Sequence, residues 1–291
     1  MGAAAIAAAA ADAVVVVAGY TATEEGEYIP GDIALGQEVP AEARDAAHRI
    51  AIGGDRDDLG LPADQLALID IAIASGKPVV VILVAGSAVM VEGWHERVGA
   101  ILQTFYSGME GGTALAKLLF GDVSPSGKLP FTVAREVAHY PYFDKQAASI
   151  QYDLWHGYSK MDRDGNAPRY AFGHGLSYAE FAYRELLATS GDAMLNVQVT
   201  VSNTGIVAAD EIVQIYIGAP GVPIERQSKL LKAFRRVTLQ PGEAAHVHFD
   251  IPLDTLRWRN AETHEWELER GDYRLMAGGA SDRLVETTVA V

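Results

Sequence analysis

The sequence contains no cysteine. Disulfide bonds, thiolate catalysis and cysteine-based zinc sites are therefore excluded, while the redox compartment stays open. No apolar run reaches the roughly 20 residues that a membrane-spanning helix needs. The small apolar start, Met1 to Ala11, lacks the basic region and the cleavage pattern of a signal peptide. Soluble, periplasmic, secreted and cytoplasmic locations all remain open.

Positive charge is also scarce, with 23 Lys and Arg against 38 Asp and Glu and a formal net charge of −15. A surface this acidic repels phosphate backbones and anionic lipids, so we expect neither nucleic acid nor membrane as a partner. A neutral ligand such as a sugar meets no such repulsion. The sequence has no phosphate-binding loop, no dinucleotide fingerprint and no Gly-x-Ser-x-Gly motif, so we expect no cofactor and no serine-hydrolase chemistry.

The first part of the chain alternates strand-like and helix-like runs. Continuous β-branched or apolar runs predict buried strands at residues 13–18, 78–84 and 98–105. Helical spacing, with Pro62 near the start, predicts a helix over Pro62 to Ser75, and a second helix is expected over Glu110 to Phe120. This order predicts an α/β fold with a mainly parallel sheet layered by helices.

A different pattern begins at about residue 183. Short runs of period 2, separated by turns such as Asn203-Thr204-Gly205, predict an all-β sandwich of immunoglobulin type. The segment Leu129 to Arg169, rich in Tyr, Asp, His and Pro, is expected to be an ordered excursion over the surface. We therefore predict two domains, residues 1–182 and 183–291.

The alanine-rich start, Ala3 to Ala11, has the composition of a helix end, so we expect the chain to start inside a domain that is truncated there. A genuine short N-terminal helix is the alternative.

Several longer motifs follow one another along the chain. They are GGDRxxLxLP at 53–62, GKPVVV at 76–81, Gly86-Ser87, GMEGG at 108–112, FGDVSPSGKLP at 120–130 and FGHGLSY at 172–178. In this order they closely resemble the C-terminal α/β sandwich domain of glycoside hydrolase family 3. The strings VSNTG at 201–205, KAF at 232–234 and LQPGE at 239–243 resemble the fibronectin type III-like domain of the same family.

The resemblance implies a retaining β-glucosidase-like hydrolase acting on a β-linked oligosaccharide or aryl glycoside. In that family an aspartate of a TIM-type barrel is the nucleophile, and a glutamate on a loop of the α/β domain is the general acid/base. This sequence shows no barrel, so we expect the chain to be inactive alone and to need a barrel from a missing N-terminal segment or another chain. Sugar specificity and homo-oligomer formation stay open.

The family position of the acid/base glutamate falls after the first predicted strand, commonly as Glu-Gly. Glu25 precedes Gly26 and is the first candidate, Glu27 is the second and Glu24 the third. Carboxylates this close raise one another's proton affinity, which suits a general acid near neutral pH. The alternative is a solvated acidic loop.

Other residues receive weaker assignments. Trp155 and Tyr158 are predicted to bind substrate by stacking on a distal sugar, as is Tyr142, although they could equally tie the excursion to the sandwich. Asp55 with Arg56, Lys128 and His174 are expected to be structural. Asp162, Asp164 and Asn166 loosely resemble a calcium loop, but the closing glutamate is missing, so we predict a turn and no metal site.

The sequence also allows a second function. The chain could be a non-catalytic carbohydrate-binding or scaffold protein, because the barrel that carries the nucleophile in the family is not part of it.

Overall fold

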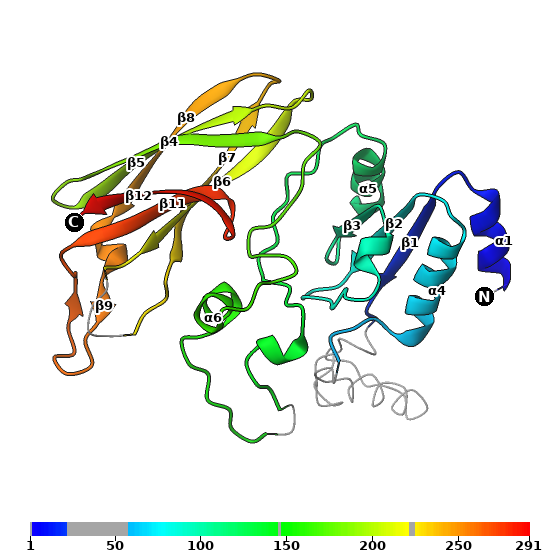
Figure 1. Ribbon diagram of the computed structural model, residues 1–291, viewed down its shortest axis with the longest axis horizontal. Coiled ribbons are helices and arrows are strands. Elements are labelled where there is room, and N and C mark those ends of the chain that lie inside the picture. Colours follow the sequence, from blue (N-terminus) through cyan, green and yellow to red (C-terminus); the bar gives the residue numbers. More distant parts are fainter. Residues whose placement is uncertain (1, 22–57, 145–146, 221–224) are drawn as a thin grey trace, which may run out of the picture. The chain divides into compact units, whose positions relative to one another are not determined.

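A computed structural model describes residues 2–21, 58–144, 147–220 and 225–291 (Figure 1). The chain forms two compact units. The first unit comprises Met1–Met109 and Arg135–Gln151, and the second comprises Glu110–Ala134 and Tyr152–Val291. No helix within the described ranges is both long and apolar enough to span a membrane.

The first unit contains a parallel sheet in the order β1-β2-β3, formed by Val14–Gly19, Val79–Val84 and Ala100–Gln103. β-branched side chains suit a pleated surface, and the central strand β2 is the most deeply buried, with Val81 fully inaccessible to solvent. The prediction of a mainly parallel sheet is confirmed. The third strand is shorter than expected at both ends. At its carboxyl end, Phe105 has a positive φ of 53°, which a strand cannot adopt.

Helices accompany this sheet. α1 spans Gly2–Ala10, and α4 spans Ala63–Ala74 and packs on β1 and on α1 (Figure 1). α4 begins directly after Pro62, whose carbonyl accepts the first helical hydrogen bonds, and Gly76 with a φ of 70° follows its end. The expected helix is thus confirmed. Two 3-10 turns, His95–Arg97 and Val137–His139, also belong to this unit.

Among its described residues, the second unit has two α-helices outside its sandwich. α5 spans Gly111–Leu119 in the predicted place. α6 spans Gly157–Asp164 and lies within the segment Leu129 to Arg169, which was expected to be an ordered excursion over the surface. Its sequence is mostly polar, and its buried residues are Ser159 and Met161. Gly165, in the left-handed conformation, caps its end. Within the described residues, no three His, Cys, Asp or Glu side chains gather as a metal site.

The remaining strands form an antiparallel sandwich of two sheets, with orders β12-β11-β6-β7 and β4-β5-β8. The bounds are β4 Phe181–Ser190, β5 Met194–Asn203, β6 Ala209–Gly218, β7 Leu230–Leu239, β8 Ala244–Pro252, β11 Asp272–Ala280 and β12 Arg283–Ala290. The short pair β9 (Trp258–Arg259) and β10 (Trp266–Glu267) and the 3-10 turn Leu253–Leu256 complete the unit. The predicted fold class, an α/β layer followed by an all-β sandwich, is confirmed.

The core of the sandwich follows the alternation of its strands. Leu195, Val197, Val199 and Val201 of β5 are all buried and face the core. β6 differs, because its residues from Val213 onward are buried on both faces of the sheet. The face of β6 that points away from the opposite sheet is therefore covered by other parts of the chain.

Candidate functional site

The carboxyl end of β1 is where the candidate acid/base segment leaves the parallel sheet. Ligands of open α/β sheets bind beyond the carboxyl ends of the strands, so this edge is the natural place for a site. The side-chain amide of Gln65, on α4, forms two hydrogen bonds with the backbone of Gly19. Gly19 N–H donates to Gln65 Oε1 at 2.7 Å, and Gln65 Nε2 donates to Gly19 O at 2.8 Å. This pairing fixes the last residue of β1 against the helix.

Gly19 itself must be a glycine. Its φ is 154°, and a Cβ at this position would overlap the carbonyl of Val84 on β2. The neighbouring Tyr20 is 6% exposed, and its backbone N–H donates to Val84 O at 3.0 Å. The strand end is therefore held by its neighbours before the chain enters residues 22–57.

The hydroxyl of Tyr20 holds the point where the chain returns. It lies 2.9 Å from Leu59 O and 2.8 Å from Gly60 O, to which it donates. Leu59 O also accepts from Met90 N–H at 2.8 Å. The two ends of the intervening stretch are thus joined beside the sheet by a buried side chain.

The same edge is fixed at the other two strands. Gln103, at the end of β3, donates from Nε2 to Ala85 O at 2.6 Å. Thr104 donates from its hydroxyl to Leu83 O at 3.1 Å. They add to the backbone bond that Thr104 N–H donates to Leu83 O at 2.9 Å, so side chains as well as backbone hold the strand ends where the loops leave the sheet.

Glu25 and Glu27, the predicted catalytic residues, lie outside the described residues, as do Glu24, Asp55 and Arg56. Their role therefore stays a prediction. The described residues at this edge hold the chain by hydrogen bonds on either side of the segment in which the general acid is predicted.

Tyr158, a predicted substrate-binding residue, lies on α6 in the second unit. Its ring is 5.1 Å from that of Phe172 and 5.9 Å, edge to face, from that of Tyr216. Its hydroxyl accepts from Leu231 N–H at 3.1 Å, and burial raises the pKa of this phenol. The ring thus covers the outer face of β6.

Trp155, the other predicted substrate-binding residue, directly precedes α6 and is 9% exposed. The Arg163 guanidinium lies 4.8 Å from the centre of its ring. Tyr142, in the first unit, is 84% exposed. Stacking on a sugar stays a prediction for Trp155 and Tyr158. The contacts of Tyr158 with Tyr216 and Leu231 favour the alternative that it ties α6 to the sandwich, whereas the Arg163 contact of Trp155 is made with α6 itself.

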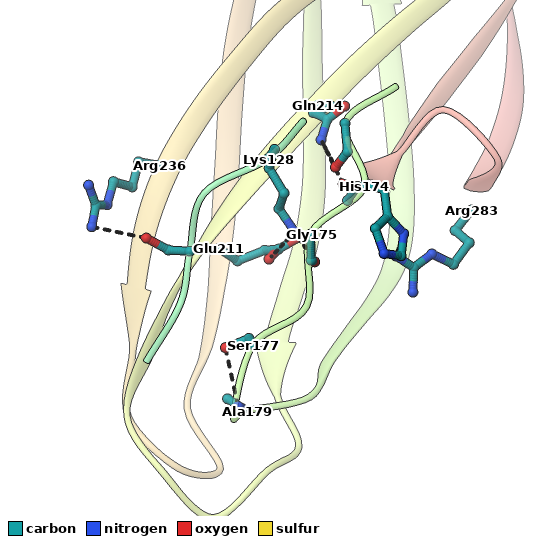
Figure 2. A network of polar contacts seen from close by, with 12 residues as sticks. Lys128, His174, Gly175, Ser177, Ala179, Glu211, Gln214, Arg236 and Arg283 are labelled. Atoms are coloured by element: carbon teal, nitrogen blue, oxygen red, sulfur yellow. Dashed lines mark hydrogen bonds and ion pairs between the residues drawn. The ribbon is translucent and has the colours of Figure 1, made fainter. Parts of the chain in front are cut away.

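A buried polar network, which sequence reasoning treated only as structural, lies in the second unit (Figure 2). Lys128 Nζ lies 3.0 Å from Glu211 Oε2 and 3.2 Å from Gly175 O. Tyr183 donates to Glu211 Oε1 at 2.7 Å, and burial, followed by the Glu211 charge, raises the pKa of this tyrosine. The motifs SPSGKLP and FGHG carried the only sequence signal for this network.

His174 of the FGHG motif stacks on Tyr170 with ring centres 5.0 Å apart. Its Nδ1 lies 3.4 Å from Arg283 Nη2, and burial, with the Arg283 charge second, lowers the pKa of the imidazole. A neutral, stacked imidazole is a packing group, in keeping with the structural role expected for it.

Comparison with known proteins identifies the family. The model of the glycosyl hydrolase family 3 C-terminal domain matches residues 1–178, and that of the fibronectin type III-like domain matches residues 211–281. The chain belongs to glycoside hydrolase family 3.

Its family 3 relatives are much longer than the chain. It is 34% identical over 242 residues to thermostable β-glucosidase B of Acetivibrio thermocellus, covering 80% of this chain and 32% of that protein. It is 35% identical over 245 residues to an exo-α-(1→6)-L-arabinopyranosidase of Bifidobacterium longum, covering 82% and 32%. The structure of β-glucosidase 3B from Thermotoga neapolitana, in complex with α-D-glucose, matches with a TM-score of 0.83 at 31% identity, covering 99% of this chain and 39% of that one.

Proposed function

We propose that this chain supplies the general acid/base glutamate of a retaining β-glucosidase-type reaction, with Glu25 as the first candidate and Glu27 as the second. The observation that supports the proposal is the anchored edge at Gly19 and Tyr20 in a family 3 C-terminal domain. The candidate glutamates follow this edge within a few residues. A strand end held by Gln65 and Tyr20 gives the following segment a fixed origin, as a catalytic carboxyl requires.

The reaction needs a second carboxylate from elsewhere. Retaining hydrolysis uses two carboxyl groups about 5–5.5 Å apart, a nucleophile that attacks the anomeric carbon and an acid that protonates the leaving oxygen. The acid then becomes the base that deprotonates the incoming water. We assign to this chain the protonation of the leaving oxygen and the later deprotonation of water. We assign the nucleophile to a barrel. The longer relatives have room for a barrel in the roughly two thirds of their length that this chain does not match.

The test combines this chain with a family 3 barrel, fused or added in trans, and measures hydrolysis of two β-glucosides. One has a phenol of low pKa as its leaving group and the other an alkyl alcohol. Loss of the general acid is expected to slow the alkyl glucoside about 100-fold or more, because the poor leaving group depends on protonation, and to affect the activated aryl glucoside far less in its first step.

The variants are Glu25→Ala and Glu27→Ala, with the exposed Glu262→Ala as the control. One of the first two should show the leaving-group dependence, and Glu262→Ala should behave as the unchanged chain does. Unchanged turnover of both substrates in Glu25→Ala and in Glu27→Ala would defeat the assignment. Calorimetric binding of oligosaccharides without any hydrolysis would favour the alternative, a non-catalytic carbohydrate-binding or scaffold protein.

A further inference from the structure

The side chains of the Lys128–Glu211 ion pair are both largely buried. The Glu211 side chain is 4% exposed and that of Lys128 is 12% exposed. Glu211 shares the parity of Val213 and Ile215 on β6, so it points between the two sheets at the end of their apolar core. Lys128 reaches this position from a segment that precedes the sandwich by many residues in the sequence.

All three donors of the Lys128 ammonium are used. The Lys128 ammonium donates to both Glu211 oxygens, at 3.2 and 3.0 Å, and to Gly175 O at 3.2 Å. The Tyr183 hydroxyl from β4 adds a further donor to Glu211. A buried carboxylate without its cation is strongly destabilising, so Glu211 makes the sandwich dependent on Lys128.

The segment that carries Lys128 is also joined to α5. Tyr178 donates from its hydroxyl to Leu118 O at 2.7 Å, adding a second hydrogen bond to a carbonyl in the last turn of α5 that also accepts from Gly121 N–H. Ser124, shortly after the helix, has its hydroxyl 2.8 Å from that of Ser177 and accepts from Tyr178 N–H at 2.9 Å. A continuous set of hydrogen bonds therefore runs from α5 through the residues before β4 to the start of the sandwich.

The outer face of β6 receives the adjacent FGHG motif. Gln214 is 2% exposed and donates from Nε2 to Gly173 O at 3.3 Å and to Gly279 O at 2.6 Å. Gly173 has a φ of 79°, and a Cβ there would overlap the Gln214 amide. Tyr216 donates to Gln214 Oε1 at 2.5 Å. Both faces of β6 are thus bound by residues that lie outside the region matched by the fibronectin type III-like model.

We propose that the sandwich is the scaffold that holds α5 in place, and that the Lys128–Glu211 ion pair is the joint between them. The sandwich and the α5 segment then unfold as one cooperative unit. A sandwich that folded independently would keep its stability whatever happened at Lys128. This proposal concerns the second unit and stands independently of the catalytic assignment.

The test is hydrogen exchange of the full chain, compared between Lys128→Met and the unchanged protein. Methionine keeps the length of the side chain and removes the charge. Exchange of the protected amides of β6 and of α5 is expected to become about 100-fold faster in both elements together, because Glu211 loses its buried partner. Lys117→Met, on the exposed side of α5, is the matched control and should leave both rates near those of the unchanged chain.

The double variant Lys128→Met with Glu211→Met separates the ion pair from simple loss of a side chain. It removes both charges, so most of the protection in β6 and α5 should return. The proposal is overturned if α5 keeps its original exchange rate while β6 loosens, or if neither element changes. It is equally overturned if the double variant exchanges as fast as Lys128→Met, and this comparison stays decisive even where the single variant folds poorly.

Discussion

At the residue scale, the close packing of Gly19 at the end of β1 leaves no room for a side chain. Adding one methyl group there, as in Gly19→Ala, forces a clash with the Val84 carbonyl and a strained φ. We expect a loss of about 3 kcal/mol or more in the free energy of unfolding of the first unit. Urea denaturation followed by fluorescence would measure it.

Gly2→Ala is the control, because a Cβ at Gly2 meets nothing within 4 Å and alanine favours the helix. It should change the stability by no more than about 1 kcal/mol. An equal effect of the two substitutions would show that Gly19 is not closely packed.

A single imidazole should give the second unit a pH dependence. Burial and Arg283 lower the pKa of His174 below its ordinary value of 6.5, so as the pH falls the unfolded chain takes up this proton first. The stability from the neutral ring is fully present above about pH 6.5 and is lost as the pH falls through the pKa of the folded state. Urea midpoints between pH 8 and pH 5 should therefore fall more steeply for the unchanged chain than for His174→Gln. Parallel slopes would contradict the assignment.

At the scale of elements, Tyr20 links the end of β1 to the segment that leads into α4. Tyr20→Phe removes the hydroxyl that bonds Leu59 O and Gly60 O and leaves the ring in place. We expect a loss of about 1–2 kcal/mol in the stability of the first unit, because two partly buried carbonyls lose a donor. Tyr142→Phe, at an exposed ring, should be neutral and serves as the control in the same thermal or urea measurement. Equal stability of the two variants would mean that the hydroxyl does not hold the segment.

The regular elements were predictable where one local signal dominates. β1 and β2 are runs of β-branched residues, and α4 combines helical spacing with Pro62 before it and Gly76 after it. α6 was not predictable in this way, because its residues are mostly polar and its contacts come from β7, where Leu231 N–H meets the Tyr158 hydroxyl. Tertiary contacts stabilise such a helix, and sequence periodicity does not report them.

At the scale of the whole molecule, the family followed from motifs and the fold class from the periodicity of apolar residues, and the buried network followed from neither. Lys128 and Glu211 are separated by 83 positions, and neither residue type is typical of a core. The substrate-binding role predicted for Trp155 and Tyr158 was hard to judge for a different reason. Aromatic residues stack on sugars and also fill protein cores, and a sequence does not distinguish the two uses. The acid/base assignment to Glu25 or Glu27 stays a prediction, and the barrel experiment decides it.

The joint at Lys128 has a consequence for anyone who recombines family members. A graft that exchanges only residues 183–291 brings a new partner for Lys128 and for the FGHG glycines, although the sequence boundary looks clean. A graft that also carries the stretch from Glu110 to Ala134 and the stretch from Tyr152 onward transfers the ammonium with its carboxylate. The useful crossover points are therefore the edges of the compact unit, even though they fall at three places in the chain.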